Sequence, residues 1–234
     1  MGIAERKERE KEIRRNMIID AAERVIFANR IDTSTMDQIA EEAELSKGTL
    51  YLYFKSKTDL YLAIQDRGMS ILAEKLARVL GEKRKGIDLL KRFGEVYFEY
   101  ANQYPNYFNA EMFCRSHEFI EEVTASELFQ CTREKRIEIV NFLIRGIQIG
   151  LQDGSIRRDV KPEELSLMLY ASLNGMIQVY MLRKQAERHD LFPEVSIDLD
   201  NVVQDFIKIL LDGLSPKSLT DSQSVYATQA LIPS

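Results

Sequence analysis

Lysine and aromatic side chains are concentrated in one short stretch, residues 44–60, with the sequence ELSKGTLYLYFKSKTDL. The stretch contains two tyrosines, one phenylalanine and three lysines, and it has no histidine and no cysteine. It therefore offers ammonium groups and flat rings, but neither a set of metal ligands nor a nucleophile paired with a base. These residue types indicate a site that binds a flat, negatively charged partner.

The first part of this stretch has the pattern of a helix that could read DNA bases. A recognition helix presents the side chains of its exposed N-terminal end to base edges in the major groove. In a helix running from Lys47 to about residue 54, those side chains are Lys47, Thr49 and Tyr51. Leu52 is expected to be exposed as well, where it could pack on a thymine methyl group.

The residues at the end of that helix are expected to anchor it. Tyr53, Lys55 and Lys57 are placed where a phenol and two ammonium groups could contact backbone phosphates and fix the register on the duplex. Leu50 and Phe54 stand four residues apart and are expected to face the protein core. The lysines would hold the duplex while the helix reads it.

Three neighbouring elements must position these groups. Apolar residues recur at steps of three and four in residues 13–29, which predicts a first helix. Thr35 has the N-cap position of a short second helix, and Gln38 completes a capping box. Ser46 can cap the third helix, and a long fourth helix is predicted to end near residue 80. Short helix, tight turn and short helix form the order of a helix-turn-helix.

Residues 35–64, TMDQIAEEAELSKGTLYLYFKSKTDLYLAI, resemble the DNA-binding segment of the TetR family of bacterial transcriptional regulators. Residues 146–177 are similar to the stretch that leads into the family's penultimate helix. The resemblance implies an all-α homodimer with an N-terminal helix-turn-helix and a C-terminal domain that binds a small effector. The base- and phosphate-contacting positions of the family match Thr35, Ser46, Lys47, Gly48, Thr49, Tyr51, Tyr53 and Lys57. Many members carry an aromatic residue or a histidine at the position of Leu52, so the base preferred there is left open.

The rest of the chain is also predicted to be helical, and no strand pattern competes. Helices are expected at about residues 87–103, 106–115, 117–151, 163–188 and 198–213. The predicted fold is all-α: an N-terminal three-helix helix-turn-helix module with a charged N-terminal arm, followed by a larger helical domain for ligand binding and dimerisation. We assign residues 1–60 to the first, residues 61–214 to the second, and residues 215–234 to a flexible tail.

Composition limits the class of protein. With 234 residues, 45% of them apolar, the chain can bury a substantial core. Its net charge of -5 gives no overall attraction to nucleic acid, so a local patch must supply that attraction. Two cysteines and the lack of a leader sequence predict a cytoplasmic protein, and no long apolar run predicts a membrane partner. The sequence has no Gly-rich phosphate loop and no paired catalytic groups, so we expect neither an enzyme nor a cofactor.

Aromatic residues recur through residues 93–113 and could line a cavity for the effector. The expected lining is Phe93, Tyr97, Tyr100, Tyr104, Tyr107, Phe108 and Phe113. The same residues could equally fill a solid core, because aromatic spacing alone does not report an empty volume. The aromatic lining and the scarcity of charge from Tyr97 to Phe113 favour an apolar or aromatic effector, which would tilt the long fourth helix as a lever.

Two apolar stripes predict that the chain forms a homodimer. The stripe in residues 198–213 is wider than a surface helix needs, and small residues in residues 163–188 would allow another helix to approach closely. A four-helix interface would bury both stripes, whereas the alternative is that they serve only the core of one subunit. The interface residues expected are Met168, Ser172, Gly175, Met176, Val203, Phe206 and Leu210.

Three further features are better explained without a functional role. Residues 5–15 alternate in charge, which favours a solvated helix over a basic arm in a minor groove. Cys114 and His117 stand three residues apart, but four convergent ligands are not evident, so no metal site is predicted. Cys131 could pair with Cys114 as a redox switch, although a buried inert thiol is favoured.

These patterns together predict a ligand-responsive, DNA-binding transcriptional regulator. We expect a repressor that binds a palindromic operator as a dimer and is released by a small effector. The alternative is an all-helical small-molecule carrier or enzyme in which the helix-turn-helix is incidental. A shift of duplex DNA by the purified protein would distinguish the two.

Overall fold

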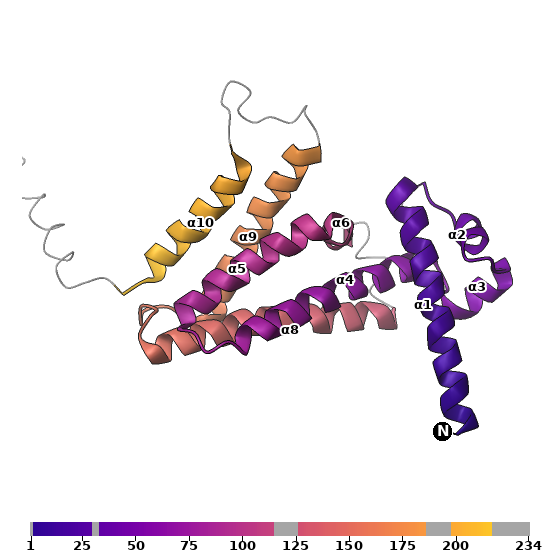
Figure 1. The fold of residues 1–234 in the computed structure, drawn as a ribbon, viewed down its shortest axis with the longest axis horizontal. Coiled ribbons are helices and arrows are strands. Elements are labelled where there is room, and N and C mark those ends of the chain that lie inside the picture. Colours follow the sequence, from indigo (N-terminus) through magenta and orange to yellow (C-terminus); the bar gives the residue numbers. More distant parts are fainter. Residues whose placement is uncertain (1, 30–32, 115–125, 186–197, 217–234) are drawn as a thin grey trace, which may run out of the picture. The chain divides into compact units, whose positions relative to one another are not determined.

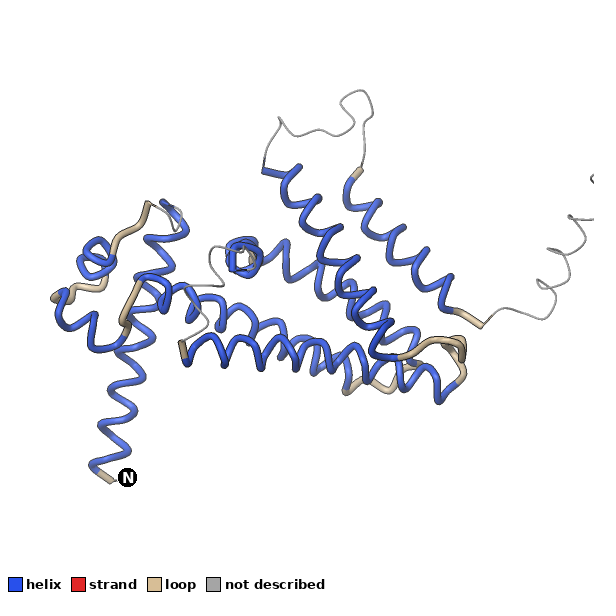
Figure 2. The backbone as a smooth tube through the Cα atoms, turned by 180° about the vertical axis from the view of Figure 1, so that it is seen from behind, coloured by secondary structure: helices blue, strands red, loops and turns tan. Residues whose placement is uncertain are grey.

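The computed structural model describes residues 2–29, 33–114, 126–185 and 198–216, and α-helices are the only regular elements within these ranges (Figures 1 and 2). The helices are α1 (Ile3–Asn29), α2 (Met36–Glu42), α3 (Lys47–Tyr53), α4 (Lys57–Leu80), α5 (Gly86–Gln103), α6 (Pro105–Cys114), α8 (Glu127–Asp153), α9 (Pro162–Gln185) and α10 (Leu199–Leu214). The predicted all-α fold is confirmed.

The chain folds into two compact units. The first unit contains residues 1–72 and 103–137, and the second contains residues 73–102 and 138–234. Helices α4 and α8 therefore contribute residues to both units. The predicted domain ranges 1–60 and 61–214 remain a prediction, and residues 217–234 of the predicted tail lie outside the described part of the chain.

The first unit is built on one apolar core. Ile18, Ala22 and Ile26 recur at steps of four along α1, and all three are buried, as the predicted helical period requires. They belong to the same cluster as Ile39 of α2 and Leu50 of α3. The three helices of the predicted helix-turn-helix module are therefore held together by a shared core.

Helix α1 begins at Ile3, so the helix predicted for residues 13–29 is continuous with the solvated helix that the alternating charges of residues 5–15 favoured. Residues 5–15 lack an apolar stripe, so the charge pattern rather than apolar periodicity indicates this part of the helix. Neighbouring charges of opposite sign stabilise such a segment weakly, and the pair Arg6–Glu10, at 2.9 Å, has the favourable spacing of four residues.

Both predicted N-caps of the helix-turn-helix form. The Thr35 side chain accepts a hydrogen bond from the backbone N–H of Gln38 at 3.2 Å, and Gln38 Oε1 accepts one from the backbone N–H of Thr35 at 2.9 Å. This is the predicted capping box. The Ser46 side chain accepts from the backbone N–H of Thr49 at 3.1 Å and so caps α3.

The turn between α2 and α3 closes with a left-handed residue. Glu44 has φ 54°, a conformation that usually favours glycine. The backbone N–H of Leu45 donates to the Ala40 carbonyl at 2.9 Å, and that of Glu44 donates to the Glu41 carbonyl at 3.0 Å. These two bonds form a Schellman motif, which ends α2 sharply and allows α3 to start three residues later.

In the second unit, α5 and α8 touch without intervening side chains. A methyl group at Gly86 would overlap the backbone of Gly150, and a methyl group at Gly150 would overlap the side chain of Ile156. Helices α9 and α10 lie side by side in both views of the fold (Figures 1 and 2).

Within the described ranges, only residues 162–183 of α9 form a helix that is long and apolar enough to cross a membrane by length and composition. Buried helices of globular proteins pass the same test, and 44% of the residues in this window are buried within the chain, so the signal is weak. The face of α9 that remains exposed therefore needs an explanation.

Candidate DNA-reading helix and effector cavity

The side chains of α3 divide between the core and the surface as predicted. Leu50 is fully buried, and so is Phe54, the residue that follows the helix. On the opposite face Tyr51 is 43% exposed and Leu52 is 84% exposed. The buried pair fixes the orientation of the helix, and the exposed pair is left available to an external partner.

Lys47, the first residue of α3, is paired with an acidic residue of α2. Lys47 Nζ lies 2.6 Å from Asp37 Oδ1, and both side chains are more than half exposed. The hydrogen bond and the negative charge of Asp37 raise the pKa of the Lys47 ammonium group. Lys47 is therefore charged at neutral pH, and its ammonium group already has a counterion on the protein.

The lysines that follow α3 differ in their surroundings. Lys55 is exposed, while its backbone N–H donates to Asp59 Oδ2 at 3.1 Å. Lys57 is half-buried, and its Nζ donates to the Ser34 carbonyl at 2.9 Å. Lys57 thus holds the turn before α2, a role that sequence reasoning did not identify. Tyr53 is half-buried and packs against the apolar core.

Gly48 occupies an exposed position in α3 that has no internal need for glycine. Among the described residues, a Cβ atom built there would have only Ser46 Oγ within 4 Å, at 3.9 Å. Glycine in a helix costs about 1 kcal/mol relative to alanine. Since the described chain has ample room for a methyl group, close approach of an external backbone is a physical reason for glycine at this position.

A polar network in the first unit joins α1, α4 and α6. Arg67 Nη1 donates to Asp20 Oδ1 at 2.6 Å and to Glu23 Oε1 at 3.0 Å, and Arg67 Nη2 donates to Asn16 Oδ1 at 3.2 Å. The Tyr107 hydroxyl group of α6 donates to Glu23 Oε1 at 2.9 Å. The network connects the predicted DNA-binding module to a helix outside it.

Burial and hydrogen bonding shift the pKa values of two groups in this network. Desolvation raises the pKa of Glu23, although the hydrogen bond from Tyr107 and the charge of Arg67 oppose the shift. Desolvation and the hydrogen bond to Glu23 raise the pKa of Tyr107 to about 12. Tyr107 is one of the residues predicted to line the effector cavity. In the structure it contacts Glu23 in the first unit instead.

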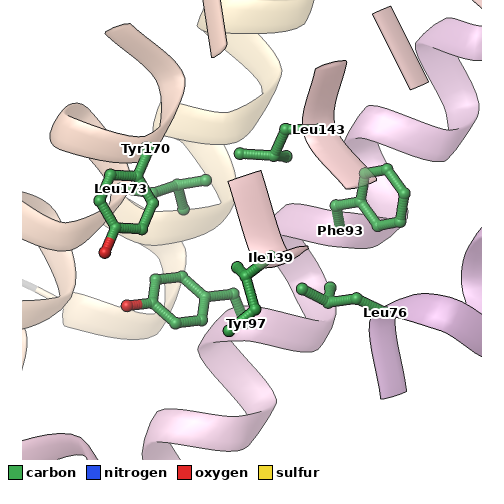
Figure 3. A pocket seen from close by; sticks show the side chains of 7 residues that line it. All are labelled: Leu76, Phe93, Tyr97, Ile139, Leu143, Tyr170 and Leu173. Carbon is green, nitrogen blue, oxygen red and sulfur yellow. The ribbon is translucent and has the colours of Figure 1, made fainter. Parts of the chain in front are cut away.

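The second unit contains a narrow apolar cavity (Figure 3). Its lining comes from α4, α5, α8 and α9 and consists of Leu76, Phe93, Tyr97, Ile139, Leu143, Tyr170 and Leu173. The space open to the centres of water molecules is about 20 Å³, which is enough for one or two waters. A larger occupant would have to widen it.

The cavity has one polar margin. Figure 3 shows the hydroxyl groups of Tyr97 and Tyr170 on the same side. The Tyr97 hydroxyl group donates to Asn174 Oδ1 at 2.6 Å, and Asn174 Nδ2 donates to the Tyr170 carbonyl at 2.7 Å. Because Asn174 is buried, these bonds satisfy a side chain that would otherwise be costly to place there.

The predicted cavity residues are divided between the two units. Phe93 and Tyr97 line the cavity, and Tyr100 is buried in the same unit. Tyr104, Tyr107 and Phe108 belong to the first unit, and the side chain of Phe113 lies outside the described part of the chain. The aliphatic residues of the lining were missed, because they come from helices that are distant in the sequence.

The predicted dimer residues lie on two helices with different exposure. Met168 is 63% exposed, and Ser172 and Gly175 are exposed beside it on α9, while Met176 is half-buried. The exposed face of α9 carries no charge over residues 167–182 and consists of Leu167, Met168, Ala171, Ser172, Gly175, Gln178, Val179 and Leu182.

On α10, the predicted interface residues are less exposed. Phe206 and Leu210 are half-buried, and Val203 is fully buried, so Val203 packs inside its own subunit. Ile209, which sequence reasoning did not select, is 70% exposed.

One prediction about the cysteines is wrong. Cys131 is exposed rather than buried, because it lies on the outer side of α8 while the next residue, Thr132, faces inward. The side chain of Cys114, together with His117, lies outside the described residues, so the metal and redox alternatives are untested. Among the described residues, no group of three or more His, Cys, Asp or Glu side chains could hold a metal ion.

Comparisons with known proteins agree with this geometry. Residues 18–64 match the family model described as bacterial regulatory proteins, tetR family. The chain is 25% identical over 208 residues to the fatty acid metabolism regulator protein of Bacillus subtilis, covering 86% of this chain and 95% of that protein. It is 26% identical over 222 residues to the HTH-type transcriptional regulator TtgR of Pseudomonas putida, covering 89% of this chain and 95% of that protein. The crystal structure of FadR from Bacillus subtilis in complex with stearoyl-CoA has a TM-score of 0.67 and 23% identity, covering 85% of this chain and 98% of that chain.

Proposed function

This chain belongs to the TetR family of bacterial transcriptional regulators, and from that premise we propose that it acts as a dimeric repressor released from a palindromic operator by a small effector. The observation that carries the proposal is the exposed face of α3, which the buried Leu50 holds in a fixed orientation. The protein would work in the cytoplasm and have no catalytic activity.

The exposed side chains of α3 would divide the work of DNA binding. Lys47 and Tyr51 would contact base edges, and Leu52 would pack on a thymine methyl group. Lys55 would contact a backbone phosphate, and the open position at Gly48 would admit the duplex closely. A two-fold dimer would place two such helices on successive major grooves, so its operator would be a palindrome.

The effector proposed is an apolar molecule with an acyl chain. Two observations support this class: the cavity lining is almost entirely apolar, and the matched Bacillus subtilis protein was crystallised with stearoyl-CoA. Because the cavity is far smaller than such a chain, binding would have to change the packing of its walls. Ligand entry and conformational change would therefore be the same event.

Helix α4 is the proposed carrier of the signal. It contributes Leu76 to the cavity wall, and at its first residue Lys57 holds the turn before α2. A tilt of this single helix would move both ends together. A coupling of about 1–3 kcal/mol would change DNA affinity roughly 5- to 150-fold, and operator DNA would weaken effector binding by the same factor.

Selection of bound duplexes from a random pool tests the DNA-binding proposal. The wild-type protein should enrich a palindrome, and Lys47→Ala or Tyr51→Ala should change the preferred bases rather than abolish binding. Lys161→Ala, at an exposed ion pair before α9, is the matched control and should leave the enriched sequence unchanged. Failure of the wild-type protein to enrich any sequence would favour a small-molecule carrier instead.

A series of acyl-CoA molecules tests the effector proposal. Each additional buried methylene group should strengthen binding about 4-fold, from about 0.8 kcal/mol, until the cavity is full, and bound ligand should release the enriched duplex. Leu173→Trp should weaken binding of the longest chains selectively while DNA binding is retained. Equal affinity for free coenzyme A and for long acyl-CoA would exclude an acyl-chain site.

A further inference from the structure

The ion pair between α2 and α3 places an acidic side chain beside a residue that would read DNA. Asp37 Oδ1 lies 2.6 Å from Lys47 Nζ. Asp37 is in the first turn of α2, and Lys47 is the first residue of α3. Both side chains are more than half exposed, and such pairs contribute little to folding stability. The effect of this pair is therefore expected in binding rather than in folding.

Because of this pair, a DNA phosphate approaching Lys47 meets an ammonium group that is already bound to the Asp37 carboxylate. A free lysine neutralises a phosphate in any sequence, which strengthens binding without selectivity. Lys47 must leave Asp37 to do so, and the carboxylate then repels the same phosphate. A guanine edge is a better partner for Lys47 than a phosphate, because its O6 and N7 atoms are fixed acceptors that can replace the carboxylate of Asp37.

We infer that Asp37 is a specificity-determining residue, which holds Lys47 back from phosphates and so weakens binding to arbitrary DNA more than binding to the operator. The inference rests on the proposed function, since it assigns a role within DNA recognition. Asp37 opposes binding, and for that reason a search for positively charged or aromatic contact residues does not find it. The quantity that measures this role is the ratio of the affinities for operator and for arbitrary DNA.

The test compares two duplexes and four proteins. One duplex is the sequence most enriched by the wild-type protein from a random pool, and the other is a shuffled sequence of the same composition. The proteins are the wild type, Asp37→Asn, Asp37→Glu, which keeps the negative charge, and Glu41→Gln, a matched control. Glu41→Gln removes the same charge as Asp37→Asn from an exposed position on the same helix. Dissociation constants are measured between about 50 and 200 mM salt.

Asp37→Asn should bind the shuffled duplex about 3- to 10-fold more tightly, with a salt slope steeper by about one, because Lys47 becomes available to a phosphate. Its affinity for the enriched duplex should change by a smaller factor. Glu41→Gln should leave the ratio of the two affinities at the wild-type value, and Asp37→Glu should restore that ratio.

A second comparison shows whether Asp37 acts through Lys47. In a Lys47→Ala background, Asp37→Asn should no longer change the ratio. Equal gains on both duplexes, a matching gain for Glu41→Gln, or persistence of the effect in the Lys47→Ala background would each overturn the inference. A wild-type protein that enriches no sequence would instead overturn the proposed function, and the inference with it.

Discussion

Gly48 is the residue at which stability and function should conflict most clearly. Replacing it with alanine should stabilise the fold by about 0.5–1 kcal/mol, because the helix gains a better helix former and no atom of the described residues opposes the methyl group. The same methyl group should weaken DNA binding if the duplex approaches this position closely. Chemical denaturation and DNA titration of Gly48→Ala measure the two effects, and undiminished DNA affinity would contradict the assignment.

Tyr107 should make the stability of the protein depend on alkaline pH. Its pKa is raised to about 12 in the folded state, above the usual value of 10.0. The folded protein therefore holds this proton more tightly than the unfolded chain does. The resulting stabilisation is fully present below about pH 10 and is lost as the pH rises through about 12.

Tyr107→Phe removes that titration. The difference in unfolding free energy between wild type and Tyr107→Phe should therefore shrink as the pH is raised from about 9 to about 12, which urea denaturation at fixed pH values would measure. A difference that stays constant over this range would show that the contact between Tyr107 and Glu23 does not hold the proton.

At the scale of elements, the close contact of α5 and α8 should tolerate no side chain. Gly86→Ala should destabilise the protein by about 2 kcal/mol or more, because the added methyl group meets the backbone of Gly150, which cannot turn aside as a flexible side chain could. Gly213→Ala on α10 is the matched control, since no atom of the described residues lies within 4 Å of its added Cβ atom. In thermal denaturation the melting temperature should be highest for Gly213→Ala, intermediate for the wild type and lowest for Gly86→Ala. A Gly86→Ala protein as stable as the wild type would mean that the two helices separate easily.

Element boundaries could be predicted where the signals are local. The capping box at Thr35 and the cap at Ser46 act over three residues, so the sequence alone placed the starts of α2 and α3 correctly. The Arg67 network could not be predicted in this way, because Arg67 and Asp20 are 47 positions apart. For the same reason the cavity prediction found Phe93 and Tyr97 of α5, but not the aliphatic walls supplied by α4, α8 and α9.

At the scale of the whole molecule, the uncharged face of α9 should bind a second copy of the chain. An exposed face of this kind is unusual for a monomer in water, and pairing with a two-fold partner would cover it. Met168→Glu would place a charge inside that interface and should shift sedimentation from dimer to monomer while helical content is unchanged. Leu52→Glu, which adds the same charge to the exposed face of α3, should lose DNA binding but remain a dimer.

The apolar core of the DNA-binding module is completed by residues far along the chain. Ala110 of α6 is buried in that core, and Leu128 and Phe129 of α8 pack against it. During synthesis these residues leave the ribosome long after α3, so the reading helix cannot be fully supported until more than half of the polypeptide has been made. A prematurely terminated chain would lack this support and would be removed by proteases, rather than occupying operators without the ability to respond to the effector.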